Sequence, residues 1–143
     1  MRMKVLYTGL MLAGLVLATG CNQSTTGGTP GEGNGTFKLK GPANTPETTV
    51  KHGESVTKDI TVDPDKNFKE DIAFDTKVEP ADGGVSASVE PMVWKASEPK
   101  KAELHIKATD KAKEGEYTIH VTGKPTKGNP TTVDVKIKVP AKK

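Results

Sequence analysis

Residues 110–123 read DKAKEGEYTIHVTG, and this stretch decides the fold. It opens with the D-x-A-x-x-G-x-Y pattern of a tyrosine corner, in which the phenol hydroxyl bonds to a backbone group a few residues upstream. The marked positions are Asp110, Ala112, Gly115 and Tyr117. A solvated tyrosine at a strand start is the alternative, but Tyr117 alternates with Ile119 and Val121, which favours an inward side chain. The stretch therefore predicts a Greek-key β-sandwich.

Alternating apolar residues continue on both sides of this stretch. The expected strands cover residues 36–40, 56–62, 72–78, 85–89, 102–108, 117–121 and 133–139. Turn residues separate them, and no sustained 3.6-residue period follows Cys21. We therefore expect an all-β chain with a single immunoglobulin-like Greek-key sandwich of about seven strands over residues 36–140, followed by a basic tail, 141–143. Ile119 stands where the second immunoglobulin cysteine would be, so apolar packing must replace the disulfide.

The N-terminus resembles a bacterial lipoprotein signal. Arg2 and Lys4 precede an apolar run, residues 5–17, that is shorter than the about 20 residues a membrane-spanning helix needs. The run ends in LATGC, which matches the lipobox, and this resemblance implies cleavage between Gly20 and Cys21 with lipid on the Cys21 thiol. The alternative is an ordinary secreted protein with a free thiol, an unusual liability in an oxidising compartment.

These features divide the N-terminal part into a signal peptide, residues 1–20, and a lipidated cysteine with a disordered tether, residues 21–35. Residues 22–35 read NQSTTGGTPGEGNG and hold no large apolar side chain that could offset the entropy of ordering. A flexible coil of this length reaches roughly 20 Å. Two or more acyl chains hold a protein stably on a membrane. Asn22 rather than Asp follows Cys21, which by resemblance to other lipoproteins favours the outer over the inner membrane.

Three stretches carry a resemblance to a known family. They are the lipobox with its following Asn-Gln-Ser, residues 66–72 (KNFKEDI), and residues 115–123 (GEYTIHVTG) with Pro125 and a later Lys-Gly pair. With these residues the chain resembles the short immunoglobulin-like lipoproteins that are abundant in planctomycete bacteria. The resemblance spans nearly the whole chain. It implies the fold and an exported location, and it implies no activity.

The charge balance argues against nucleic acid as a partner. The full chain has a net charge of +3, but Arg2 and Lys4 belong to the signal, so 19 of the 21 basic residues remain against 18 acidic ones, a net charge of +1. No arginine follows Arg2. Phosphate and base recognition relies on the bidentate guanidinium group, so we expect no nucleic-acid partner.

The sequence offers no catalytic constellation. Serine, histidine and aspartate occur without a nucleophile elbow, and no phosphate-binding glycine motif is present. His52, His105 and His120 lack the spacing of zinc ligands, and no second cysteine exists. We therefore expect no enzyme activity, no cofactor and no metal.

A calcium loop is the one metal site that stays open. Asp63, Asp65 and Asn67 have the opening spacing of an EF-hand, but Phe68 and Phe74 occupy the required glycine and glutamate positions. A weak loop-bound Ca²⁺ is the alternative to a solvated strand connection.

Aromatic residues make up only 4% of the chain, and Trp94 is its single tryptophan. In the register of Val93, Trp94 is expected to point outward, where it could contact a ligand with Phe68 as a second aromatic. Alternatively, Trp94 covers the edge of its own sandwich. The main functional hypothesis is a lipid-anchored, non-catalytic module that serves structure or protein contact in the cell envelope. The second is a polysaccharide-binding module that uses Trp94.

Overall fold

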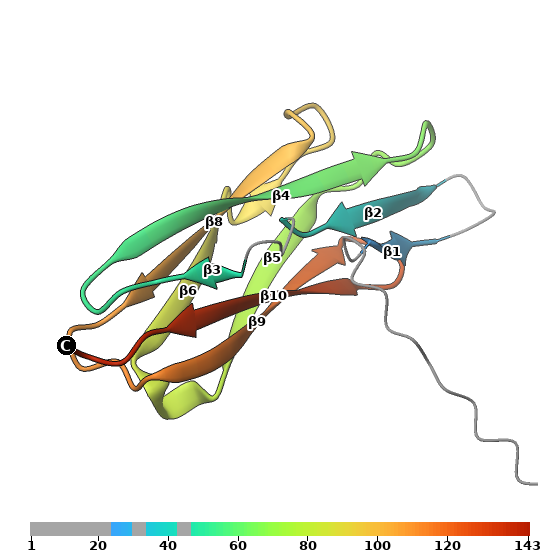
Figure 1. The fold of residues 1–143 in the computed structure, drawn as a ribbon. Coiled ribbons are helices and arrows are strands. Elements are labelled where there is room, and N and C mark those ends of the chain that lie inside the picture. Colours follow the sequence, from blue (N-terminus) through green and yellow to red (C-terminus); the bar gives the residue numbers. More distant parts are fainter. Residues whose placement is uncertain (1–23, 30–33, 43–46) are drawn as a thin grey trace, which may run out of the picture.

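The computed structural model describes residues 24–29, 34–42 and 47–143, which form two five-stranded sheets packed face to face (Figure 1). Sheet A contains, in spatial order, β1 (Ser24–Gly28), β2 (Thr36–Lys40), β4 (Ser55–Pro64), β8 (Lys101–Ala108) and β6 (Val85–Glu90). Sheet B contains, in spatial order, β3 (Thr48–Thr49), β10 (Thr131–Val139), β9 (Gly115–Pro125), β5 (Ile72–Glu79) and β7 (Val93–Trp94). The all-β sandwich expected from the sequence is confirmed.

The strand order is the immunoglobulin-like one. The run β2-β4-β8-β6 in sheet A and the run β10-β9-β5 in sheet B correspond to the A-B-E-D and G-F-C orders of that fold. Neighbouring strands pair antiparallel, except that β3 runs parallel to β10. The prediction of about seven strands was too low, because β1, β3 and β7 are short strands without an alternating apolar pattern.

Alternation along the long strands builds the core between the sheets. In β10, Val133, Val135, Ile137 and Val139 are buried while the residues between them face outward, and the other long strands follow the same period. Ile119 on β9 is fully buried, so an apolar side chain occupies the position where the fold otherwise has a cysteine. Burying one such side chain stabilises the fold by about 1.5–3 kcal/mol.

The disordered tether expected over residues 21–35 is wrong for residues 24–28, which form β1. All five residues pair with β2, from Ser24 opposite Lys40 to Gly28 opposite Thr36. The pairing depends on the absence of a side chain at Gly27, where an added Cβ would lie 2.9 Å from the Phe37 ring. Backbone pairing rather than apolar burial therefore orders this segment, so its composition could not reveal it.

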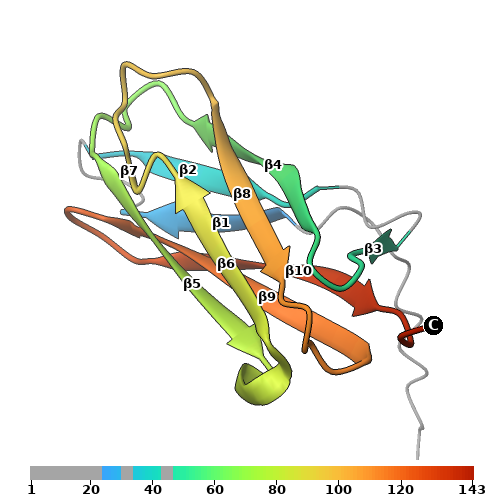
Figure 2. The ribbon, with the colours of Figure 1, turned by 90° about the vertical axis from the view of Figure 1, so that its left-hand side faces the viewer.

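The two sheets are joined at the side opposite β1. The short 3₁₀ helix η1 (Ala81–Gly83) leads from β5 in sheet B to β6 in sheet A (Figure 2). Near the middle of both strands, the Thr76 hydroxyl on β5 donates a hydrogen bond of 2.8 Å to the Ala87 carbonyl on β6. This bond occupies a carbonyl in the middle of a strand that lies at the edge of its sheet.

Candidate functional site

The tyrosine corner lies at the end of the sandwich where η1 joins the sheets. The Tyr117 side chain is 2% exposed, and its hydroxyl lies 2.7 Å from the Lys113 carbonyl and 3.0 Å from the Gly83 carbonyl. The single phenol proton can be donated to either carbonyl. Lys113 lies four residues upstream, as the corner motif predicts. Burial raises the pKa of the Tyr117 hydroxyl.

The remaining motif residues support the same corner. The Ala112 amide donates to the Thr109 carbonyl at 3.0 Å, and the Ala112 side chain is buried. Gly115 begins β9 with a φ of 138°, a backbone conformation that residues other than glycine rarely adopt. An added Cβ on Gly53 would lie 2.4 Å from the Asp110 carboxylate, which places Asp110 against the β3–β4 turn.

Sequence reasoning missed Gly83, which completes the corner. Its carbonyl accepts a hydrogen bond from the Lys113 amide at 2.8 Å and lies within reach of the Tyr117 hydroxyl. An added Cβ at Gly83 would lie 2.0 Å from an atom of the Tyr117 ring, so only glycine fits. The available signal was the pair of glycines after Asp82, of which a simple turn needs only one.

The expectation that Trp94 points outward is wrong. Trp94 is fully buried, and its indole nitrogen donates a 2.7 Å hydrogen bond to the Pro99 carbonyl. The neighbouring Val93 is instead 45% exposed, and Met92 is 74% exposed. The reason is that the chain passes from sheet A to sheet B between β6 and β7, so the alternation of the earlier strand does not continue. Trp94 therefore covers its own sandwich and cannot stack on a sugar.

Phe68 is not a surface aromatic either. It is 4% exposed, and its ring centroid lies 5.0 Å from that of Phe37. The two rings are tilted by 45°, an arrangement in the range favoured by aromatic pairs. The structure does not bring Phe68 and Trp94 to a common binding surface, and the ligand contact expected from them is overturned.

The residues of the calcium hypothesis serve the loop itself. Asp65 accepts backbone hydrogen bonds from Thr36 at 2.7 Å, Asn67 at 2.8 Å and Phe68 at 3.0 Å. The bond from the Thr36 amide is the main cause that lowers the pKa of Asp65. Asp63 lies 3.4 Å from the Lys100 amine. Among the described residues, no three His, Cys, Asp or Glu side chains gather closely enough to hold a metal ion.

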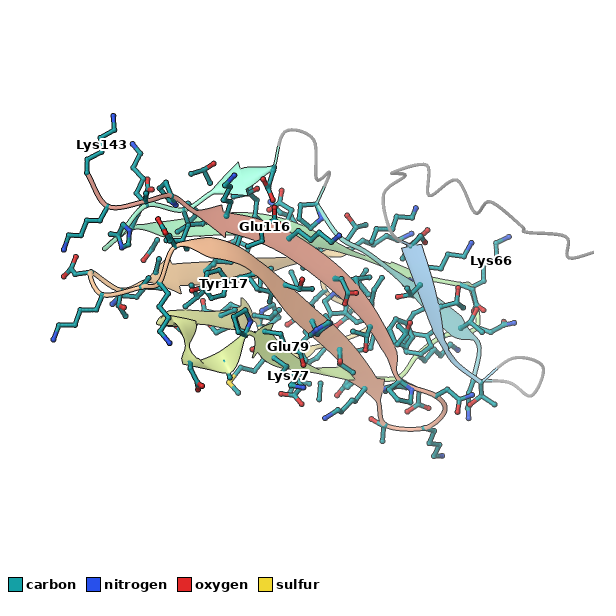
Figure 3. The ribbon with its side chains drawn as sticks, turned by 60° about the horizontal axis from the view of Figure 1, so that its bottom comes forward. Lys66, Lys77, Glu79, Glu116, Tyr117 and Lys143 are labelled. Carbon is teal, nitrogen blue, oxygen red and sulfur yellow. The ribbon has the colours of Figure 1, made fainter. Side chains whose placement is uncertain are left out.

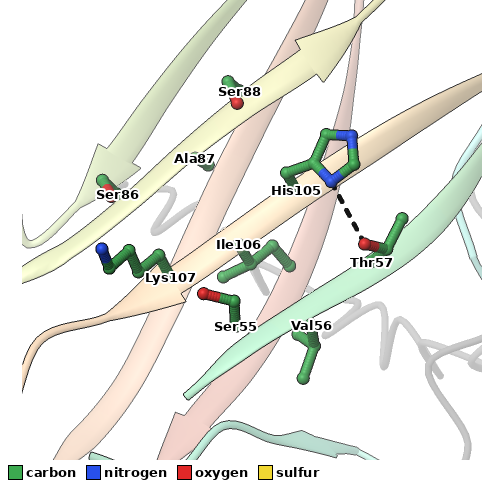
Figure 4. A pocket seen from close by; sticks show the side chains of 9 residues that line it. All are labelled: Ser55, Val56, Thr57, Ser86, Ala87, Ser88, His105, Ile106 and Lys107. Carbon is green, nitrogen blue, oxygen red and sulfur yellow. Dashed lines mark hydrogen bonds between the residues drawn. The ribbon is translucent and has the colours of Figure 1, made fainter. Parts of the chain in front are cut away.

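A shallow depression of about 430 Å³ lies on the outer face of sheet A (Figure 4). Its outward side chains form two rows across β4, β8 and β6. The rows are Ser55–Lys107–Ser86 and Thr57–His105–Ser88. The Thr57 hydroxyl lies 3.1 Å from His105 Nδ1, the bond drawn in Figure 4. Short hydroxyl side chains on both sides of His105 and Lys107 produce the hollow, which is a solvated sheet face rather than a closed cavity.

A charged cluster lies on the outer face of sheet B. His120 Nδ1 on β9 lies 2.6 Å from Asp134 Oδ1 on β10, and its Nε2 lies 3.5 Å from Glu79 Oε2 on β5. Glu79 also pairs with Lys77, which lies beside it in Figure 3. The bond to Asp134 is the main cause that raises the pKa of His120. His105 and His120 lie on different sheets, so they do not form a common site.

Gly20 and Cys21, the expected cleavage and lipid-attachment residues, lie outside the described residues. The first described residue, Ser24, is three positions after Cys21 and begins β1. Within the part of the chain that the structure describes, no helix has the length and apolar character needed to cross a membrane.

No protein-family model matches the chain, and no curated protein matches it. Among solved structures, the chain is similar to domains 4 and 5 of the S-layer protein SbsC, with a TM-score of 0.48, 17% identity, and coverage of 66% of this chain and 47% of that one. It is also similar to rSbsC(31-844), with a TM-score of 0.46, 16% identity, and coverage of 64% and 11%. A structure of SbsC domains 1–6 gives a TM-score of 0.48, 17% identity, and coverage of 67% and 12%. The chain spans less than half of each matched chain, and likenesses at these TM-scores carry no argument about function.

Proposed function

We propose that this protein is a lipid-anchored module of the bacterial cell envelope. The observation that carries the proposal is the LATGC motif ending at Cys21, behind a basic start and a short apolar run. The folded part supports it, because the sandwich begins just after the motif and provides a compact unit for display. Asn22 after Cys21 leads us to favour the outer over the inner membrane.

Expression of the full chain in a bacterium with a lipoprotein pathway tests the anchor. We expect the protein in the membrane fraction, with a mass that includes acyl chains on an N-terminal Cys21. Cys21→Ser should abolish acylation and cleavage together, so that its mass lacks the acyl chains and still includes residues 1–20. Ser24→Ala is the matched control, because this exposed residue lies outside the motif and should leave the distribution unchanged. A Cys21→Ser protein that is still cleaved after Gly20 and fractionates like the wild type would contradict the proposal.

For the displayed module we propose a structural or protein-contact role rather than a catalytic one. The two surface features described above are a shallow hydroxyl-lined hollow and a charged cluster, and neither supplies an enclosed reaction site. Met92 and Val93 on the β7 edge are exposed apolar side chains of the kind that protein contacts bury. The polysaccharide hypothesis loses its basis, because Trp94 is buried.

A photo-crosslinking residue placed at position 92 in intact cells tests the contact role. We expect an adduct with a defined envelope protein from position 92. The same residue at position 127, an exposed lysine in the β9–β10 turn, is the control and should give none. Identical adduct patterns from both positions would contradict a contact at the β7 edge.

A further inference from the structure

The first strand of the sandwich starts very close to the proposed lipid-attachment residue. Only Asn22 and Gln23 separate Cys21 from Ser24 at the start of β1. Three residues of chain span at most about 10 Å even when fully extended. A tether that continued to residue 35 would instead let the domain drift roughly 20 Å away. The position of β1 therefore sets how closely the sandwich follows the lipid.

β1 is held by contacts on both of its sides. It pairs with β2 along its whole length, and the Gly28 amide donates a 2.8 Å hydrogen bond to the Asn129 carbonyl in the β9–β10 turn. The Asn129 amide returns a bond of 3.2 Å to the Gly28 carbonyl. Gly27 lies against the Phe37 ring, which is fully buried in the core. β1 is thus fastened to both sheets.

The two side edges of the sandwich differ in their surface chemistry. Near β1 the outward side chains are polar, with exposed Ser24 and Thr26 on β1 and exposed Lys38 opposite Thr26 on β2. Such groups suit the lipid headgroup layer, where a lysine is attracted to an anionic surface. The apolar Met92 and Val93 lie at the other edge, next to β6 and β5.

We infer that the sandwich is mounted on the bilayer by its β1 edge, with the start of β1 within about 10 Å of the lipidated residue and the β6–β7 edge turned away from the membrane. This inference rests on the proposed lipid anchor. It identifies the headgroup surface as the partner of the β1 edge. It also leaves Met92 and Val93 facing outward, where a second protein can reach them.

Fluorescence quenching on vesicles tests this orientation. The lipidated full chain is reconstituted into vesicles of phosphatidylethanolamine and phosphatidylglycerol that carry a quencher on the headgroup. A single label is introduced at Lys38→Cys or at Met92→Cys, and the acylated Cys21 leaves no other thiol to react. Lys38 is the critical position, because it is 17 residues after Cys21 in sequence and is brought near it only by the β1–β2 pairing. We expect quenching at position 38 to be several-fold stronger than at position 92.

Two further variants separate the β1 mount from simple tethering. A flexible Gly/Ser insertion of about 20 residues between Gln23 and Ser24 adds roughly 25 Å of reach and should remove the difference between the labels. Gly27→Val should have the same effect by expelling β1 from the sheet. Equal quenching at both positions in the unmodified chain, or a difference that survives the insertion, overturns the inference.

The vesicle experiment also shows which proposal fails. If the lipidated chain beginning at residue 21 binds vesicles no better than a Cys21→Ser chain that also lacks residues 1–20, the lipid anchor is wrong and the orientation falls with it. If binding depends on Cys21 but both labels are quenched equally, the anchor stands and only the orientation is wrong.

Discussion

The corner around Tyr117 and the strand β1 both fasten the two sheets together, but they do so by different means. At the corner, a buried phenol reaches two backbone carbonyls and a glycine makes room for its ring. At β1, glycines bring one backbone against another, and the bonds run between main-chain groups. The first device leaves a side-chain motif in the sequence. The β1 contacts leave only a Gly/Ser/Thr-rich composition that is also typical of linkers, so they are recognised from the structure and not from the sequence.

Of the variants considered, Gly83→Ala should lower the stability of the fold most, and it acts on the tyrosine corner. The added methyl group would lie 2.0 Å from the Tyr117 ring, so the ring or the turn must move, at a cost of about 3 kcal/mol in the free energy of unfolding. Chemical denaturation of the purified domain measures the loss. Gly41→Ala is the control, because a Cβ there meets its nearest atoms at an ordinary 3.9 Å. Equal stability of both variants would show that the corner tolerates the methyl group.

Gly27→Val acts on the β1 side and should cost about 2 kcal/mol, since its Cβ alone would lie 2.8 Å from the Asn129 carbonyl oxygen. We expect the damage to stay local. Hydrogen exchange should lose protection in residues 24–28 and 36–40, while the amides around Tyr117 remain protected. Uniform loss of protection would mean that the two regions unfold as one unit.

Tyr117→Phe should cost about 1 kcal/mol, because it removes one buried hydrogen bond and leaves the ring in place. The variant also tests an alkaline dependence. Burial raises the pKa of the Tyr117 hydroxyl above 10.0, so its stabilising effect is complete below about pH 10 and is lost as the pH rises through the folded-state pKa. Denaturation midpoints measured across this range should fall for the wild type and stay flatter for the phenylalanine variant.

Asp65→Asn should have the smallest effect, and its pH dependence should be the opposite. Because the Thr36 amide lowers the pKa of Asp65 below 3.8, this carboxylate stabilises the fold above that value and loses its effect as the pH falls through the folded-state pKa. Thermal melts in acid should show the wild type losing its advantage over the asparagine variant. Parallel acid curves for the two proteins would exclude a role for this carboxylate. The acid difference between the wild type and Asp65→Asn thus reports on the β2 end of the molecule, and the alkaline difference between the wild type and Tyr117→Phe reports on the corner.

Much of the fold follows from the sequence, for reasons that particular residues make clear. The long strands alternate strictly, as Val133 to Val139 show, and the Tyr117 motif identifies the crossover. Trp94 was misplaced, because alternation cannot be carried across a change of sheet. The binding site expected from Trp94 and Phe68 is not formed, because both aromatic side chains are buried in the core. A small domain has few large side chains with which to fill its core. The role of Gly83 depends on a contact 34 residues away in sequence.

The hydrogen bond from the Thr76 hydroxyl to the Ala87 carbonyl affects how readily the β6 edge can pair with a strand of another molecule. Proteins confined to a membrane meet their own copies often, and an edge strand with free acceptors invites strand-to-strand association between them. Thr76 occupies one acceptor site of the Ala87 carbonyl in the middle of β6, so a strand that extended sheet A there would compete with this bond. The middle of the β6 edge therefore offers one free acceptor fewer to a strand from another molecule.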